Sequence, residues 1–164
     1  MKNIAWKEIT QFEAPEESPG FLLWQVSTNW RRLIETALAK IGLTHPQFVL
    51  LASLGWLHRN QSEVTQAELA RHCRTDVNMT SQVLRTLEKK GYIERSHRSG
   101  NQRSKFPKVT ENGAKIIEQA IPLVEQVDRH FFEKLGSDAK DCVKIMQKLA
   151  LEKDSCAERD CPPT

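Results

Sequence analysis

The chain has 164 residues, 39% of them hydrophobic and 27% charged, with a formal net charge of +3. A chain of this length and composition can bury a sizeable core, which excludes unfolded, collagen-like and low-complexity proteins. It has no apolar run near the roughly 18 residues of a transmembrane helix and no signal-peptide core, so we expect a cytoplasmic protein without membrane contact.

Residues 1–42 are expected to form an N-terminal arm and a first dimerisation helix. The arm ends in the acidic segment 13–17 and suits either a short helix against a partner subunit or a loose segment. Ser18 and Pro19 favour a helix start, and Gly42 favours its end. The apolar residues between them recur at helical spacing: Leu22, Val26, Trp30, Leu33, Ile34, Ala37, Leu38 and Ile41. This stripe exceeds the needs of a small core, which indicates a dimer interface or a hydrophobic cleft.

Residues 43–110 are expected to form a separate functional region that begins with a central helix. Thr44 and Gln47 have the spacing of a capping box, in which each side chain bonds the backbone N–H of the other residue. The helix that follows is apolar on all sides from Phe48 to Leu57. A helix of this kind is buried.

A second capping box, Thr65 with Glu68, starts the next helix. Cys73 shares the apolar face of that helix and is expected to be buried. After a short turn, a further helix is predicted from about 77 to 90, and Gly91 is the residue type expected just past its end. Its apolar positions recur at helical spacing: Met79, Val83, Leu84 and Leu87.

Two short strands, 92–96 and 105–109, are predicted next, with the basic loop 97–103 between them. Helix, turn, helix and hairpin in this order make a winged helix-turn-helix, so the predicted fold class is mainly α. From Arg71 to Lys108 the chain has ten Lys and Arg against three Asp and Glu, a balance of +7, which leaves −4 for all other residues. This uneven charge favours a polyanionic partner.

The second helix of the pair is expected to enter the major groove of double-stranded DNA, because a helix with its side chains matches that groove in width. Its polar face supplies the candidate contacts to base edges and nearby phosphates: Asn78, Ser81, Gln82 and Arg85. Thr75 and Thr80 are candidate contacts to the DNA backbone. Arg98, Arg103 and Lys105 are expected to serve the wing. Two alternatives stay open, a solvated basic face and a winged helix that contacts protein or RNA.

Residues 111–153 are expected to form C-terminal dimerisation helices, and residues 154–164 a disordered tail. Thr110 is suited to cap a long helix whose apolar positions are Ile116, Ile117, Ala120, Ile121, Val124, Val127, Phe131 and Leu135. A last helix is predicted from 138 to about 152. Pairing these helices with a second copy of the chain would bury their apolar stripes in a two-fold homodimer.

The chain has four cysteines, Cys73, Cys142, Cys156 and Cys161. The first two lie on apolar helix faces, where a free cysteine behaves as a small hydrophobe. The tail pair falls short of the four ligands of a structural zinc site. A cysteine-based redox-responsive regulator is kept as an alternative. No catalytic, metal-binding or cofactor-binding motif is recognisable, so we expect neither an enzyme nor a bound metal or cofactor.

From 43 to 110 the chain resembles the MarR family of bacterial transcriptional regulators. The resemblance rests on the order and spacing of the segments LTHPQF at 43–48, TQAELA at 65–70, LEKKGYIER at 87–95 and VT at 109–110. It implies a homodimer whose two recognition helices enter successive major grooves of a pseudo-palindromic operator. Such proteins usually repress transcription and are usually released by a small molecule or an oxidant.

The family's wing carries the motif Asp-x-Arg, in which the Arg enters the minor groove and the Asp holds it. The resemblance places Arg103 at the Arg position and Asn101 at the Asp position. Asn accepts a hydrogen bond from a guanidinium but supplies no charge, so this departure weakens the brace.

The resemblance also implies an effector pocket between the dimer helices and the DNA-binding region. Arg31 or Arg32 would then be the anion partner of an apolar or aromatic acid. The aromatic residues near such a pocket would be Trp24, Trp30, Phe48 and Trp56. The same aromatic residues would also suit the core.

Overall fold

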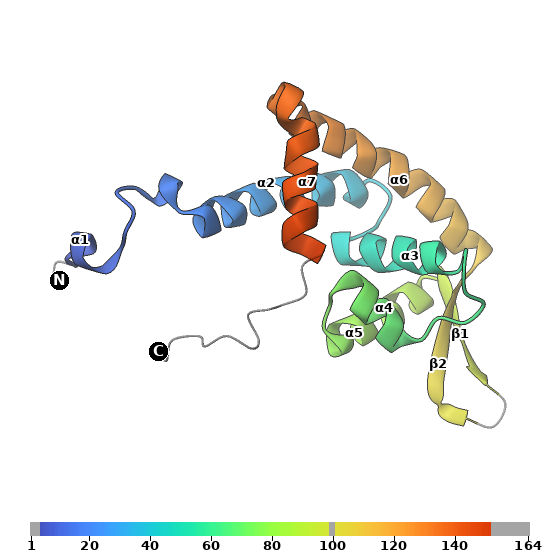
Figure 1. The fold of residues 1–164 in the computed structure, drawn as a ribbon. Helices are drawn as coiled ribbons and strands as arrows, with labels where there is room; N and C mark the ends of the chain where they lie inside the picture. The colour runs from blue at the N-terminus through green and yellow to red at the C-terminus, as the bar shows by residue number, and fades with distance from the viewer. Residues whose placement is uncertain (1–3, 99–100, 152–164) are drawn as a thin grey trace. The chain divides into compact units, whose positions relative to one another are not determined.

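A computed structural model describes residues 4–98 and 101–151, without the side chains of 96–105 and of 151. Its elements are helical except for one two-stranded antiparallel hairpin (Figure 1). This confirms the predicted fold class, a mainly α winged helix-turn-helix. The chain divides into two compact units, Met1–Val127 and Asp128–Thr164. None of the described helices is long and apolar enough to span a bilayer.

The N-terminal elements are α1 (Trp6–Ile9), η1 (Pro15–Glu17) and α2 (Pro19–Ala39). Ser18 begins α2, as expected, by accepting a hydrogen bond from the backbone N–H of Phe21 at 3.4 Å. The apolar stripe of α2 is only partly buried within a single chain. Ile34 and Leu38 are buried, whereas three members of the stripe are exposed: Leu22, Val26 and Leu33.

The central helix is α3 (His45–Leu57), and it begins with the predicted capping box of Thr44 and Gln47. Its residues Leu50, Leu51 and Leu54 are buried. They form one core with residues of the surrounding elements: Ile34, Leu38, Leu69, Leu84, Leu87, Ile93 and Ala120. The expectation of a central buried helix is therefore confirmed except at Trp56, which is exposed.

The helix pair consists of α4 (Gln66–Cys73) and α5 (Val77–Lys89). The second capping box is present, with the Thr65 backbone N–H donating to Glu68 Oε2 at 2.7 Å. Arg74, in the turn, has a left-handed backbone with φ of 50°. Gly91 follows α5 with φ of 72°, a conformation that glycine adopts without strain.

The hairpin consists of β1 (Ile93–Arg98) and β2 (Asn101–Val109), with Ile93 opposite Val109. Figure 1 shows it beside the α4–α5 pair. The strands are longer than the predicted 92–96 and 105–109, because the backbone pairing continues into most of the segment that the sequence suggested was a loop. Arg98 is still paired, opposite Asn101, after a register shift.

Helix α6 (Glu111–Phe132) follows the hairpin. The Thr110 hydroxyl donates to the carbonyl of Gly91 at 2.6 Å and accepts from the N–H of Gly113 at 3.1 Å, so one residue ties the start of α6 to the end of α5. The predicted continuation of this helix to Leu135 is wrong, because the chain enters a 3-10 helix, η2 (Glu133–Asp138), at Glu133.

The last described helix is α7 (Ala139–Leu151), which agrees with the helix predicted from 138. Cys142 on this helix is partly buried. Most of its large apolar residues are exposed: Val143, Ile145, Met146 and Leu149. Cys156 and Cys161, like the rest of the predicted tail, lie outside the described residues.

Candidate DNA-binding surface

Helix α5 presents a polar face to solvent. Its start is capped by Asp76, whose Oδ1 accepts from the backbone N–H groups of Asn78 at 2.8 Å and Met79 at 3.0 Å. On the inner side Leu84 and Leu87 are fully buried. The predicted base-contacting residues lie away from the core: Asn78, Gln82 and Arg85 are exposed and Ser81 is half-buried. The cap and the core therefore fix the orientation of this face.

Ser81 and Arg85 form a pair on that face. They are one helical turn apart, and Nη2 of Arg85 lies 3.3 Å from the hydroxyl oxygen of Ser81. Such a contact limits the rotamers of the long Arg side chain before any ligand binds. The structure therefore brings two of the predicted site residues together.

The two threonines that we predicted as DNA backbone contacts pair with each other. Their hydroxyl oxygens are 2.8 Å apart, and the Thr80 hydroxyl also donates to the carbonyl of Asp76 at 2.9 Å. Thr80 is 0% exposed, so a direct contact with DNA is not possible for it, and we correct that prediction. Thr75 is half-buried and keeps its candidate role. Met79, which we expected on the apolar face, is exposed instead.

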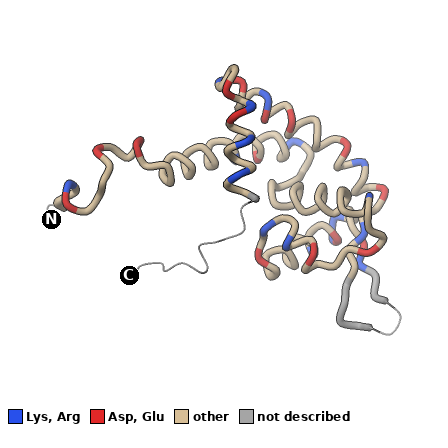
Figure 2. The backbone as a smooth tube through the Cα atoms, in the orientation of Figure 1, with Lys and Arg blue, Asp and Glu red and all other residues tan. Residues whose placement is uncertain are grey.

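The wing residues Arg98, Arg103 and Lys105 have side chains outside the described part of the structure, so their contacts remain predictions. Their backbones lie on β1 and β2. The base of the hairpin is described, and Figure 2 shows Lys and Arg there as well as on α4 and α5. Basic residues at these positions, on and beside α5, agree with the charge distribution seen in the sequence.

Arg95, at the base of β1, forms an ion pair that sequence inspection missed. Its Nη2 lies 3.0 Å from Oε2 of Glu88 on α5, and the Arg95 side chain is only 7% exposed. The Arg95 Nε atom is buried and has no hydrogen-bond partner among the described residues. In the sequence, the only signal for this contact is that Glu88 and Arg95 are seven positions apart. The geometry of the ion pair depends on how β1 folds back along α5.

Lys90 is a second residue with long-range contacts that the sequence did not reveal. Its Nζ donates to the carbonyl oxygen of Gly42 at 2.6 Å and to Oε1 of Gln47 at 2.9 Å. Gln47 is buried and also closes the capping box of α3. Lys90 is itself exposed, and its two partners lie more than 40 positions away in the sequence.

Three titratable groups near these helices have shifted pKa values. Burial and the positive charge of Lys108 lower the pKa of His58. Hydrogen bonds from the backbone and hydroxyl of Thr65 lower the pKa of the Glu68 carboxyl. Burial raises the pKa of the Cys73 thiol, which keeps the sulfur protonated and reduces its nucleophilicity.

The residues predicted for an effector pocket lie in different environments within one chain. Trp24 is 62% exposed and stacks on Phe21, with the ring centroids 6.1 Å apart. Trp56 is 59% exposed and lies under the Arg59 guanidinium at 4.5 Å. Trp30 and Phe48 pack against the core, and Arg31 is exposed with its Nε 4.0 Å from Glu35.

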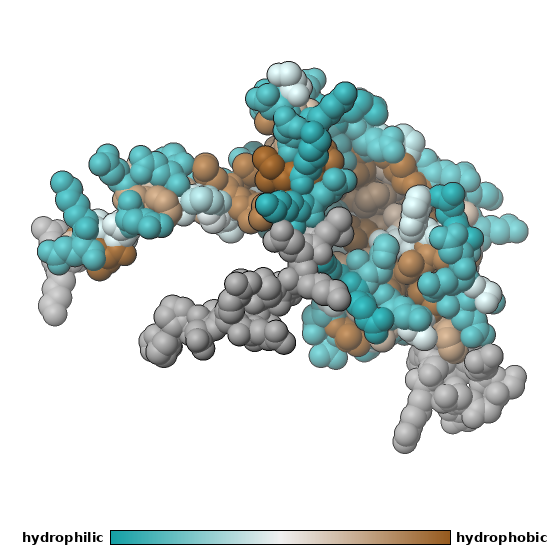
Figure 3. All heavy atoms as spheres, in the orientation of Figure 1, coloured by the Kyte–Doolittle hydropathy of each residue, from teal (hydrophilic) through white to brown (hydrophobic). Residues whose placement is uncertain are grey.

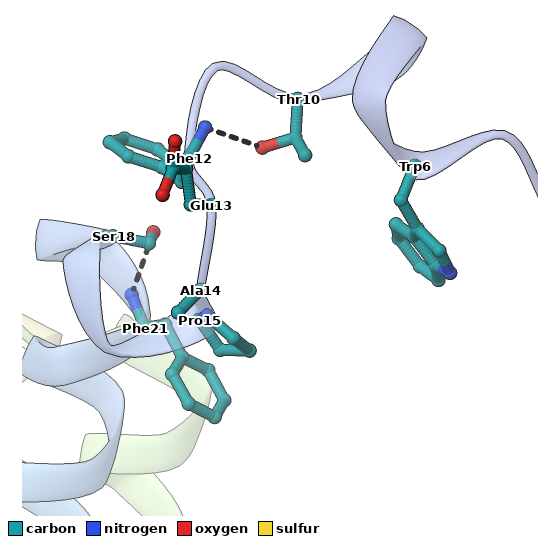
Figure 4. Close-up of a pocket in the computed structure, with 8 residues that line it drawn as sticks. All are labelled: Trp6, Thr10, Phe12, Glu13, Ala14, Pro15, Ser18 and Phe21. Carbon is teal, nitrogen blue, oxygen red and sulfur yellow. Dashed lines mark hydrogen bonds between the residues drawn. The ribbon is translucent and has the colours of Figure 1, made fainter.

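Two cavities of the first unit bear on small-molecule binding. One of about 370 Å³ is lined by Ala52, Ser53, Trp56, His72 and Ile121, so it includes one predicted pocket residue. Another of about 600 Å³ lies in the N-terminal arm, where Trp6, Phe12, Pro15 and Phe21 contribute to its wall (Figure 4). The sequence gave no signal for the second cavity, because its wall combines isolated apolar residues of an irregular segment.

Exposed apolar residues are concentrated on the N-terminal elements. The large ones there are Ile4, Trp6, Ile9, Phe21, Leu22, Leu23, Trp24 and Val26. In Figure 3 groups of brown, hydrophobic residues lie among teal, hydrophilic ones along this part of the chain. Soluble monomers rarely expose large contiguous apolar patches, so a concentration of exposed apolar residues favours an interaction surface.

The capped helix pair, the exposed polar face of α5 and the adjoining hairpin define a winged helix-turn-helix protein. A model of the MarR family matches residues 43–105. The transcriptional regulator YdcH of Bacillus subtilis is 45% identical over 123 residues, which cover 75% of this chain and 84% of that protein. The chain therefore belongs to the MarR family.

Other relatives agree with this assignment. The repressor Rv2887 of Mycobacterium tuberculosis is 31% identical over 131 residues, covering 79% of this chain and 91% of that protein. Its structure in complex with salicylic acid matches with a TM-score of 0.62 and 28% identity, over 80% of this chain and 96% of that one. A mutant of Escherichia coli MarR in complex with operator DNA matches with a TM-score of 0.72 and 26% identity, over 86% and 99% of the two chains.

Proposed function

We propose that this protein is a cytoplasmic transcriptional repressor that binds a pseudo-palindromic operator as a homodimer and is released by a small-molecule effector. The observation that carries the proposal is the polar, solvent-facing side of α5 beside a basic hairpin. Such a helix can enter the major groove while the hairpin reaches the adjacent minor groove. The relatives named as regulators and repressors, and the E. coli MarR complex with operator DNA, support it.

Operator recognition is assigned to α5 and the wing. Asn78, Ser81, Gln82 and Arg85 would contact base edges and nearby phosphates, and Thr75 would contact the DNA backbone. In the wing, Arg103 would enter the minor groove, with Arg98 and Lys105 on phosphates. Arg103→Ala should weaken operator binding by about 1–3 kcal/mol. Unchanged affinity together with an unchanged salt dependence would refute that role.

The homodimer is proposed from apolar surface that one chain leaves exposed. On α2 this surface includes Leu22, Val26 and Leu33, and on α7 it includes Val143, Ile145, Met146 and Leu149. A second copy that covers these faces would remove them from water, and two-fold symmetry would present two recognition helices to one operator. Sedimentation of the purified protein should give twice the chain mass.

The proposed effector is an apolar or aromatic acid. The relative Rv2887 has been solved with salicylic acid. Arg31 or Arg32 would pair with the carboxylate, beside Trp24, Trp30, Phe48 or Trp56. Trp56 lines a cavity with Ala52, Ser53, His72 and Ile121, and dimerisation would complete the pocket. A panel of aromatic carboxylates should change the tryptophan fluorescence, and no change across the panel would count against this part of the proposal.

The central experiment is binding of the protein to a fluorescent duplex from its own upstream intergenic region, titrated in salt with unrelated duplex as competitor. Selective binding by two subunits per site, with a steep salt dependence, is expected. Weak binding that the competitor removes equally well would mean either that the operator lies elsewhere or that the wing serves another partner, and a genome-wide selection of bound fragments would decide between them. A change of affinity with peroxide, abolished by Cys→Ser substitution, would instead favour a redox switch. The raised pKa of Cys73 disfavours that outcome for this residue.

A further inference from the structure

An open groove of about 540 Å³ runs between α5 and the base of β1. It is lined by Gln66, Ser81, Arg85, Glu88, Lys89 and Arg95. Three of these residues are cationic and one is anionic, and Glu88 is already paired with Arg95. The groove therefore keeps a surplus of positive charge.

Arg95 lines this groove, and its hydrogen bonding to other described residues is incomplete. Its side chain is 7% exposed, and one ion pair with Glu88 uses Nη2. The buried Nε has no hydrogen-bond partner among the described residues. A guanidinium has five N–H donors and no acceptor, so an anion with several acceptor oxygens is the kind of ligand that can bond the Nη N–H groups that Glu88 does not use.

Gln66 and Lys89, two other polar residues of the groove, can also donate N–H hydrogen bonds to a ligand. Nε2 of Gln66 donates to the carbonyl of Val77 at 3.2 Å, which leaves its second N–H for a ligand. Lys89, at the last position of α5, is exposed. Donors from three elements, α4, α5 and β1, therefore line one groove.

The position of the groove identifies the anion. If α5 lies in the major groove and the hairpin in the adjacent minor groove, the phosphodiester strand that separates the two grooves must pass between α5 and the hairpin. The groove lies at that place. We propose that it binds one backbone phosphate of the operator, with Arg95 and Lys89 as its cationic partners and Gln66 as a neutral donor. This inference rests on the proposed function.

The site has a consequence for how the two reading elements act together. Arg95 belongs to the wing, whereas Lys89 and Glu88 belong to the recognition helix. A phosphate bound between them fixes the register of the strand relative to both elements, and phosphate contacts of this kind position a protein without reading sequence.

The test compares Lys89→Ala with Lys115→Ala, a matched loss of one exposed lysine on α6, outside the groove. Operator and unrelated duplex are both titrated over a range of salt concentrations. For Lys89→Ala the slope of log affinity against log salt should become less steep by about 0.9 per bound subunit, on both duplexes. Equal slopes for the two variants would overturn the phosphate site.

A second arm replaces single operator phosphates by uncharged methylphosphonates. In the wild type, one replacement in each half-site should lower affinity about tenfold, as expected for the loss of a hydrogen-bonded charged partner. In Lys89→Ala and in Arg95→Lys the same replacement should lower affinity by a smaller factor than in the wild type. If the replacement lowered affinity by the same factor in the wild type and in both variants, the direct contact would be overturned. The unfolding curve of Arg95→Lys checks that its fold is retained.

The outcomes also separate this site from the proposed function. Equal affinity of the wild type for operator and unrelated duplex would refute operator recognition, whereas the salt slopes would still decide the phosphate site. Absence of any binding to duplex DNA would overturn both.

Discussion

Nη2 of Arg95 lies 3.0 Å from Oε2 of Glu88, so the base of the wing is tied to the recognition helix by one ion pair. The Arg95 side chain is almost completely buried, whereas the Glu88 side chain is 43% exposed. The pair therefore does not behave as an ordinary surface salt bridge, because loss of the carboxylate would leave a buried guanidinium without its counter-charge.

Glu88→Gln should lower the free energy of unfolding by about 1–2 kcal/mol, a value reduced from that of a fully buried pair because Glu88 is partly solvated. Urea denaturation followed by circular dichroism measures it. Glu94→Gln, an exposed carboxylate on β1, is the control and should have little effect. Equal losses in the two variants would show that the pair contributes nothing specific.

Gly113 allows α6 to approach the start of the hairpin. A Cβ atom at this position would overlap the carbonyl oxygen of Tyr92 and lie 2.9 Å from Cγ1 of Val109. Gly113→Ala should therefore destabilise the protein by about 1–3 kcal/mol, as overpacking does. At Gly20, in the first turn of α2, a Cβ would meet no atom within 4 Å.

Gly20→Ala serves as the matched control for that substitution. It should leave stability unchanged or raise it by up to about 1 kcal/mol, because alanine restricts the unfolded chain more than glycine does. Thermal unfolding of both variants tests the contrast. A Gly113→Ala protein as stable as the wild type would mean that α6 and the hairpin are not in close contact.

His58 should make stability depend on pH between the pKa of the folded protein and the ordinary value of 6.5. Burial and Lys108 lower the folded-state pKa, so the unfolded chain binds more protons in this interval. Stability should therefore fall as the pH is lowered from 6.5 toward the folded-state pKa, and the contribution is constant above and below this window.

Urea denaturation at several pH values between about 5 and 7.5, a range chosen to span the ordinary histidine pKa, measures the effect. His58→Gln should lose part of the pH dependence, whereas His72→Gln, an exposed histidine on α4, should retain it. Glu68 does not interfere, because its lowered pKa places its contribution below pH 4.5. The same slope in both variants would exclude His58 as the source.

Arg85 lies on the exposed face of α5 and contacts Ser81 one turn earlier on the same helix. Arg85→Ala should weaken operator binding by about 1–3 kcal/mol and leave the dimer intact. Fluorescence anisotropy and analytical ultracentrifugation measure the two properties, with Lys115→Ala as the charge control. Loss of the dimer with unchanged DNA affinity would show that this face of α5 serves assembly.

The sequence by itself determined the local elements of the helix-turn-helix. Capping boxes depend on residues three positions apart, so Thr44 with Gln47 and Thr65 with Glu68 marked two helix starts correctly. Gly91, with its positive φ, marked the end of α5. The polar face of α5 was also predicted correctly, because helical periodicity places Asn78, Gln82 and Arg85 on one side whatever the rest of the chain does.

The tertiary structure decided which residues of these elements are available. Thr80 is buried and Met79 exposed, the reverse of what polarity suggests, because the Thr75 hydroxyl and the Asp76 carbonyl satisfy the Thr80 hydroxyl inside the fold. The Arg95 side chain is buried against Glu88 of α5. Lys90, although exposed, bonds Gly42 and Gln47 far away in the sequence. These outcomes depend on how separate elements pack, and no local pattern encodes that packing, whereas caps and periodicity act within a few residues.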